Sequence, residues 1–184
     1  MLLGGLGGFV VALVTMFKKD AAPYTVPVYG ALEGLLLGAL SATYEARYPG
    51  IVMNAVGLTF GTLFALLMAY TSRLIAVTDN MRLGVAAATG GIMIMYLISM
   101  VMGFFGVQIP FIHSSGPVGI AFSLFVVGLA AFNLVMDFDF IERGAESSAP
   151  KYMEWYGAFG LVVTLIWLYI EMLRLLAKLQ SRRD

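Results

Sequence analysis

Charged residues divide the chain into long apolar stretches that are joined by short polar segments. A helix needs about 20 mostly apolar residues to cross the hydrocarbon core of a bilayer. Residues 83–136 contain no Asp, Glu, Lys or Arg, and a cluster of Gly, Pro and Ser over residues 103–117 divides this stretch in two. The pattern predicts six transmembrane helices, at about residues 2–17, 24–44, 51–73, 83–105, 117–138 and 153–176.

These spans predict an all-α integral membrane protein, folded as one helical bundle over residues 1–184. The connecting segments are short, and none marks a domain boundary. The first stretch has no basic segment before it, and Lys18 and Lys19 follow it directly. This arrangement favours a membrane helix over a cleaved signal peptide.

Composition supports the same class of protein. Apolar residues make up 60% of the chain and charged residues only 12%, against about 25% in typical soluble domains. So few polar side chains cannot cover a water-soluble globule, and a net charge of zero disfavours nucleic-acid binding. The chain has no cysteine and one histidine, His113, so thiolate and multi-histidine metal sites are excluded and no cofactor is expected.

The distribution of basic residues does not decide the orientation, because six lie on one side of the predicted bundle and five on the other. The larger group is Lys18, Lys19, Arg73, Arg82, Arg143 and Lys151, and the smaller group is Arg47, Arg174, Lys178, Arg182 and Arg183.

Ionisable residues within the spans are the first candidates for function, because a charge in the membrane interior is costly. Glu33 lies near the middle of the second span. Asp137 and Asp139 end the fifth span, and a separation of two residues turns them to opposite faces of a helix. Asn133 shares the face of Asp137, whereas Arg143 lies one turn after Asp139 and could pair with it.

Glu154 opens the last span on the same side of the membrane as Asp137, so the two carboxylates could approach each other. Carboxylate oxygens are ligands that Ca²⁺ prefers, and a transient Ca²⁺ site at Asp137 and Glu154 is one possibility. Each of these acids also has a structural interpretation. Glu33 could be hydrogen-bonded in the bundle, the two aspartates could merely end a span, and Glu154 could stabilise a helix N-terminus.

Two further features have mainly structural interpretations. Glycines at a spacing of four, in three of the spans, predict close helix contacts. Glu171 and Arg174 are three residues apart and predict a salt-bridged helix end that reaches the membrane surface. The glycines are Gly4, Gly8, Gly30, Gly34, Gly38, Gly57 and Gly61.

An intramembrane enzyme is disfavoured. His113 and Ser114 are neighbours in sequence, and adjacency alone does not make them a nucleophile and a general base. The sequence also shows no motif that would form an oxyanion hole. We interpret residues 113–115 as a polar loop.

With these residues in view, the chain resembles the Bax inhibitor-1 family, also called the transmembrane Bax inhibitor motif family, and is most similar to its bacterial YccA-like branch. The resemblance covers the chain from about residue 24. The segments that carry it are Tyr29–Gly38, Asn54–Arg73, Met136–Glu142 and Tyr156–Arg174.

The resemblance implies a fold of seven membrane helices. The first span of this chain aligns with the second helix of the family, so we expect the family's first helix to be missing. The implied activity is an acid-sensitive cation leak, studied mostly as Ca²⁺ release. The implied sensor is a pair of aspartates, which match Asp137 and Thr164 here.

Threonine cannot share a titrating proton, so either Asp139 or Glu154 replaces the second aspartate from another position, or this branch lacks the sensor. The family's latch arginine falls on Lys18 or Lys19. The leading hypothesis is therefore a pH-gated Ca²⁺ leak channel in a bacterial inner membrane. The alternative is a membrane regulator that binds a membrane protease or another membrane complex, since the YccA-like branch includes such a modulator.

Overall fold

The computed structural model describes residues 2–106 and 116–182, and this part of the chain is all-α. His113 lies outside the described residues. A one-turn 3₁₀ helix, η1 (Lys19–Ala21), joins the first two helices. The α-helices are α1 (Leu2–Phe17), α2 (Ala22–Arg47), α3 (Ile51–Thr71), α4 (Asp79–Phe104), α6 (Pro117–Glu146) and α7 (Tyr152–Gln180).

Five of these helices, α2, α3, α4, α6 and α7, are long and apolar enough to cross a membrane. The helix α1 is apolar but shorter: its 16 residues extend about 24 Å, which is less than the hydrocarbon thickness of about 30 Å. The prediction of an all-α bundle of six membrane helices is confirmed for the fold and for five long apolar helices, while α1 is apolar but shorter than a full membrane span.

Several helices continue past the apolar stretches that identified them. The helix α6 ends at Glu146, about eight residues beyond the predicted span, and α7 extends to Gln180. Charged side chains mark where a helix leaves the hydrocarbon core of the membrane. They do not break the helix, because its backbone hydrogen bonds can still form beyond them. The candidate residues Asp137 and Asp139 therefore lie well inside a regular helix.

Local chemistry fixes the helix starts. Pro117 occupies the first turn of α6, where a missing backbone N–H does no harm. At α4 the Thr78 hydroxyl accepts a hydrogen bond from the Met81 backbone N–H at 3.2 Å. Gly50, with a φ of 85°, makes the sharp turn into α3.

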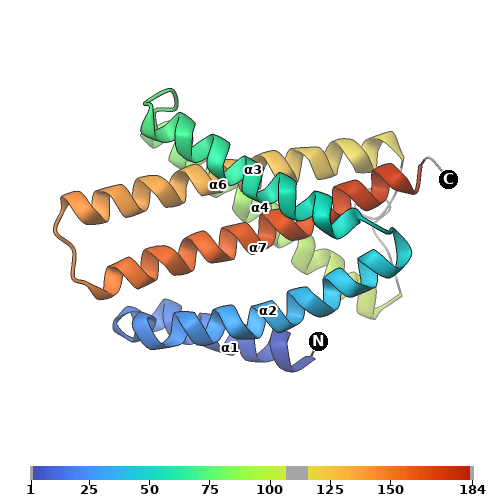
Figure 1. Ribbon diagram of the computed structural model, residues 1–184, viewed down its shortest axis with the longest axis horizontal. Coiled ribbons are helices and arrows are strands. Elements are labelled where there is room, and N and C mark those ends of the chain that lie inside the picture. Colours follow the sequence, from blue (N-terminus) through green and yellow to red (C-terminus); the bar gives the residue numbers. More distant parts are fainter. Residues whose placement is uncertain (1, 107–115, 183–184) are drawn as a thin grey trace.

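The helices α6 and α7 form a hairpin at the centre of the bundle (Figure 1). The helix α7 contacts α2, α3 and α6, while α6 also contacts α3 and α4. The helix α1 lies along α2 at the edge of the bundle. The central hairpin thus positions any group that it carries against several other helices.

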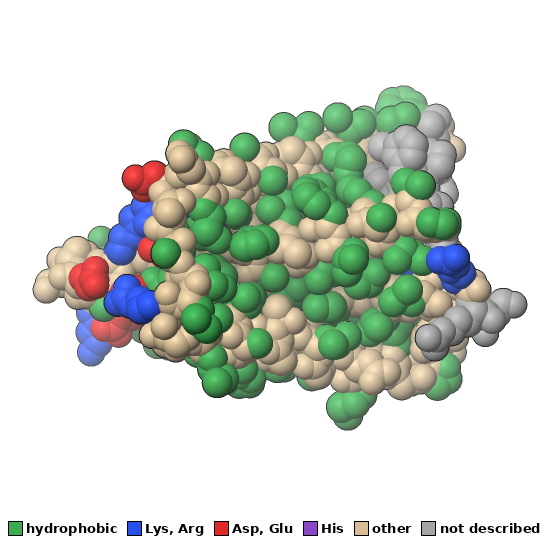
Figure 2. All heavy atoms as spheres, turned by 90° about the horizontal axis from the view of Figure 1, so that it is seen from above, with side chains coloured by type: hydrophobic (Ala, Val, Ile, Leu, Met, Phe, Trp, Pro, Cys, Tyr) green, Lys and Arg blue, Asp and Glu red, His purple; other side chains and the backbone are tan. Residues whose placement is uncertain are grey.

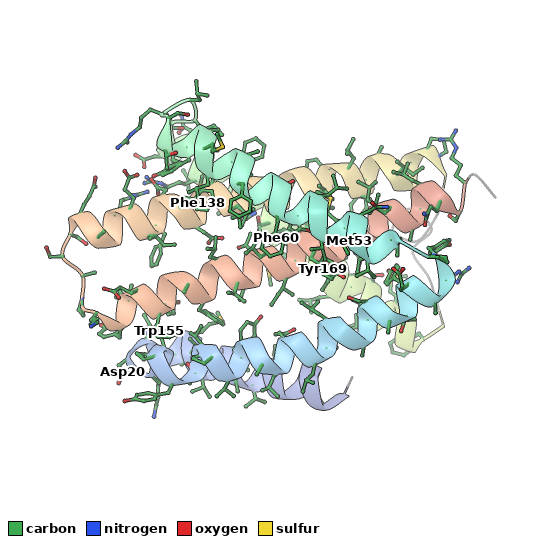
Figure 3. The ribbon with its side chains drawn as sticks, viewed as in Figure 1. Asp20, Met53, Phe60, Phe138, Trp155 and Tyr169 are labelled. Carbon is green, nitrogen blue, oxygen red and sulfur yellow. The ribbon has the colours of Figure 1, made fainter. Side chains whose placement is uncertain are left out.

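The largest core cluster lies where α3, α6 and α7 meet, and it includes the fully buried Leu134, Leu168 and Leu173. Phe138 and Tyr169 lie in the same region (Figure 3). Outside the core, large apolar side chains cover the flanks of the bundle, while most charged side chains in view gather at one end and a smaller basic group lies at the other (Figure 2). This surface suits a bilayer around the flanks and water at the end.

The glycine prediction is confirmed for one helix pair only. A Cβ added at Gly4 would lie 2.8 Å from the Leu32 carbonyl oxygen, so α1 and α2 cross with their backbones nearly in contact. For the other predicted glycines, an added Cβ meets no described atom within 4 Å, and the prediction of close helix contact there is wrong. These positions are Gly30, Gly34, Gly38, Gly57 and Gly61.

Candidate functional site

Asp137 lies on α6 and faces α7. The Thr164 hydroxyl is close enough to hydrogen-bond to its carboxyl group. Its Oδ2 atom is buried and has no hydrogen-bond partner among the described residues. A Cβ at Gly160 would lie 3.4 Å from Oδ1, so the glycine lets the backbone of α7 approach this carboxyl.

The carboxyl of Asp137 borders a hollow of about 560 Å³ between α1, α2, α6 and α7. The other lining groups are mostly apolar or aromatic. Tyr29 and Tyr156 both line it, and both rings pack against Phe159, at centroid distances of 5.1 and 6.2 Å. In such surroundings an ionised carboxylate lacks the solvation that water gives. Gain or loss of a proton at Asp137 should therefore affect how the helices around the hollow pack.

The sequence resemblance matched Thr164 to the second sensor position, and the structure brings Thr164 against Asp137 from the facing helix. A threonine hydroxyl donates one hydrogen bond to an ionised carboxylate and can accept one from a protonated acid. The pair can therefore exist in two hydrogen-bonding states that differ in the position of one proton.

Asp139 faces the opposite way, as the helical period predicted. One carboxylate oxygen accepts from Arg143 on the same helix, and the other pairs with Arg82 of α4 at 3.2 Å. The pair with Arg143 was predicted from sequence. The pair with Arg82 was not, because a partner 57 residues away leaves no local signal.

Glu142, one turn further along α6, was missed as a candidate by sequence reasoning. It accepts hydrogen bonds from the Tyr70 hydroxyl and from Arg73 at the end of α3, the latter at 3.0 Å. The carboxylates of Asp137, Asp139 and Glu142 thus join α6 to α7, α4 and α3 in turn.

Glu154 is exposed at the start of α7 and borders a different hollow from the one that Asp137 lines. Within residues 2–106 and 116–182, no group of three or more acidic or histidine side chains is placed to hold a metal ion. A two-carboxylate Ca²⁺ site at Asp137 and Glu154 stays a prediction.

Glu33 is 9% exposed and lies in the crossing of α1 and α2. A Cβ at Gly8 would lie 2.5 Å from its Oε1 atom, so the carboxyl fills the space that this glycine leaves. Tyr29, one turn before Glu33, lines the hollow of Asp137, whereas Glu33 does not.

The two candidate latch lysines lie at the turn between α1 and α2. The Lys19 ammonium group lies 5.0 Å from the centroid of the Tyr156 ring, which is a cation–π distance. Tyr156 lines the hollow, so Lys19 lies against a residue that borders the same hollow as Asp137. Among the described residues, no ion pair within 4 Å joins Lys18 or Lys19 to that carboxyl.

A second polar cluster joins α4 and α7 near the other end of the bundle. Glu171 is 1% exposed, pairs with Arg174 at 2.7 Å and accepts from the Tyr96 hydroxyl at 2.9 Å. The prediction that this helix end reaches the membrane surface is wrong for Glu171, because α4 covers it. Lys178, one turn after Arg174, is also buried and donates to the Ser123 hydroxyl at 2.8 Å.

Comparison with known proteins gives one match. The family model described as "Bax inhibitor 1 like" matches residues 1–181, which includes the N-terminal residues before position 24. Neither a curated protein nor a solved structure matches the chain. The match covers nearly the whole chain and agrees with the apolar helices, so this integral membrane protein belongs to the Bax inhibitor 1 like family.

Proposed function

We propose that this protein is a pH-sensitive cation leak channel, with Ca²⁺ as the permeant ion, and that Asp137 is its proton sensor. The observation that carries the proposal is the position of the Asp137 carboxyl: it borders a hollow between four helices, and its Oδ2 atom is buried without a described partner. A buried carboxyl with an unused oxygen can take either a proton or a cation at that atom.

The gating step follows from the hydrogen bond between Asp137 and Thr164. When Asp137 is ionised, it only accepts, and the Thr164 hydroxyl holds α7 against α6. When Asp137 is protonated, the carboxyl can donate, and its attraction for nearby cations is lost. A change in one proton therefore shifts the equilibrium between a closed and an open packing of these helices.

Lys19 is the proposed latch cation, with Lys18 as the neighbouring alternative. The stacking of Lys19 on Tyr156 supports this role, because it keeps an ammonium group beside the hollow. Asp139, Glu154 and Glu33 are proposed as secondary sensor groups. The salt bridges of Asp139 with two arginines make it the group whose protonation would loosen α6 from α4.

We further propose that the protein acts in a bacterial inner membrane. This placement rests on the resemblance of the Tyr29–Gly38 and Met136–Glu142 segments to the YccA-like branch.

Ca²⁺ flux from proteoliposomes at pH 6, 7 and 8 tests the channel. Flux should increase toward pH 6 in the wild type. Asp137→Asn, which mimics the protonated side chain, should remove the pH dependence and leave a constant leak. The matched control is Asp79→Asn, because the Asp79 side chain is 91% exposed and lies outside the hollow.

Two results would contradict the proposal. One is flux with an unchanged pH profile in Asp137→Asn. The other is absence of flux at every pH from protein whose helical content is intact, which would favour the alternative of a regulator that binds a membrane protease.

A further inference from the structure

A second hollow, of about 570 Å³, lies between α4, α6 and the segment that leads into α7. We call it the α4–α6 groove. It adjoins the hollow of Asp137, with which it shares the lining residues Met136 and Phe140, but the Asp137 carboxyl does not line it. The lining residues are Arg82, Val85, Ala86, Asn133, Met136, Asp139, Phe140, Arg143, Gly144, Ser147, Ala149 and Met153.

One end of the α4–α6 groove is basic. Arg82 comes from the first turn of α4, and Arg143 comes from the last turn of α6. The Nε atom of Arg82 is buried and has no hydrogen-bond partner among the described residues, although its two terminal nitrogens bind Asp79 and Asp139. Arg143 is about half exposed and uses one terminal nitrogen for Asp139. Arg143 therefore keeps accessible donors for an additional acceptor, while Arg82 contributes its positive charge and one buried N–H without a described partner.

The charges that line the groove sum to one positive charge, from two arginines and one aspartate. Asp79 is not part of the lining, and its side chain is almost fully in water, where its field is screened. A single excess positive charge beside two guanidinium forks matches a phosphodiester, which carries one negative charge and binds arginine through paired oxygens.

Beyond the charged residues the lining is mostly apolar, with Asn133 and Ser147 as its other polar members, and it follows the axis of α6. From Arg143 back to Asn133 the axis of α6 covers ten residues, which is about 15 Å. Val85 and Ala86 form one wall, and Met136 lies on the other. A ligand that fills this groove would have its anionic end beside the start of α4 and the end of α6, and an apolar body along the middle of these helices.

We propose that the α4–α6 groove binds an anionic phospholipid, with the phosphodiester on Arg82 and Arg143 and an acyl chain along Val85 and Met136. Basic pockets between membrane helices are known to recognise acidic headgroups. An inorganic phosphate ion would use only the basic end and would leave the apolar wall uncovered. The proposal concerns a lipid site and is independent of whether the protein conducts ions.

The test is the selectivity of the full chain for spin-labelled phosphatidylglycerol over spin-labelled phosphatidylcholine. The protein is reconstituted in phosphatidylcholine vesicles, and electron paramagnetic resonance gives the motionally restricted fraction of each label. Near a membrane surface each charge contributes roughly 1 kcal/mol, so each substitution should change the selectivity about fivefold.

Two kinds of substitution should act in opposite directions. Arg82→Gln and Arg143→Gln should each lower the selectivity for phosphatidylglycerol. Asp139→Asn removes the one negative charge of the lining and should raise it. Loss of a merely structural contact does not produce opposite signs, so the sign pattern separates lipid binding from general loosening of α6. Arg47→Gln is the matched control, because Arg47 is exposed at the end of α2 and lies outside the groove.

Three outcomes would overturn the proposal. One is an equal loss of selectivity in Arg47→Gln, which would indicate a general surface charge effect. Another is a decrease in Asp139→Asn with helical content intact. The third is complete displacement of phosphatidylglycerol by millimolar inorganic phosphate, which would identify a free-anion site instead of a lipid site.

Discussion

Asp137 and Asp139 are two residues apart on α6, yet they join it to different helices: Asp137 faces Thr164 of α7, and Asp139 pairs with Arg82 of α4. The first carboxyl has a neutral partner and a buried oxygen without a described partner, whereas the second has two arginines. Protonation should therefore have different consequences at the two sites.

Thr164→Val should weaken the ionised, closed form of the proposed channel. The substitution removes the hydroxyl that donates to Asp137, and a hydrogen bond to a charged group is worth roughly 1.5–3 kcal/mol. We expect about tenfold more Ca²⁺ flux at pH 7 than in the wild type. Thr59→Val is the control, because the Thr59 hydroxyl is buried and bonds the Ala55 carbonyl of its own helix at 2.8 Å. A Thr164→Val profile identical to that of the wild type would exclude a role for this hydroxyl.

Gly4→Ala should destabilise the contact between α1 and α2. The new methyl group would lie 2.8 Å from the Leu32 carbonyl oxygen and 3.1 Å from the Leu36 nitrogen, and backbone atoms cannot move aside as a side chain can. We expect a loss of about 1–3 kcal/mol in unfolding free energy, measured in detergent micelles. Gly34→Ala provides the comparison: it meets no described atom within 4 Å and should be neutral or slightly stabilising.

The buried pair of Glu171 and Arg174 should respond unequally to removal of either partner. Arg174→Met leaves the fully buried Glu171 carboxylate without its cation and should cost about 3 kcal/mol. Glu171→Met should cost less, because the Arg174 side chain is 31% exposed and can turn toward water. The double variant should recover much of the loss. Equal costs for the two single variants, measured by denaturant unfolding, would show that Glu171 is hydrated.

The exposed salt bridge between Arg73 and Glu142 should contribute little. The Arg73 side chain is 78% exposed, and pairs of this kind are worth about 0–1 kcal/mol. Arg73→Gln should therefore change the unfolding free energy by less than Arg174→Met does. The small effect should disappear at high salt, which screens exposed charges. A large, salt-independent loss would contradict the expectation that this exposed pair contributes little.

The sequence predicted the helices well because hydropathy reports directly on what lipid accepts. Helical periodicity was also sufficient to predict that Asp137 and Asp139 lie on opposite faces of their helix. It could not identify Arg82 as a partner of Asp139, because which helix lies beside which is a property of the assembled bundle. The same limit explains the glycines: a spacing of four permits a close approach, but among the predicted glycines that the structure describes, an added Cβ meets another helix only at Gly4 and Gly8.

The sequence also did not predict which charged side chains would be buried. Glu171 lies near a helix end with basic residues around it, which is typical of a side chain at the membrane surface. Its burial depends on Tyr96, which belongs to α4 and is 75 residues earlier in the chain. The sequence around Glu171 carries no information about a contact with a residue from another helix.

The central position of α7 has a consequence for biogenesis. Ribosomes synthesise α7 after α2, α3 and α6, so these three helices can enter the membrane before the helix that they all contact exists. Until then the faces of α3 and α6 that will pack against Leu168 and Leu173 have only lipid or the insertion machinery as neighbours. Quality-control proteases that sample nascent membrane proteins would therefore meet an open bundle, and a stop codon within α7 should yield a chain that is inserted but rapidly degraded.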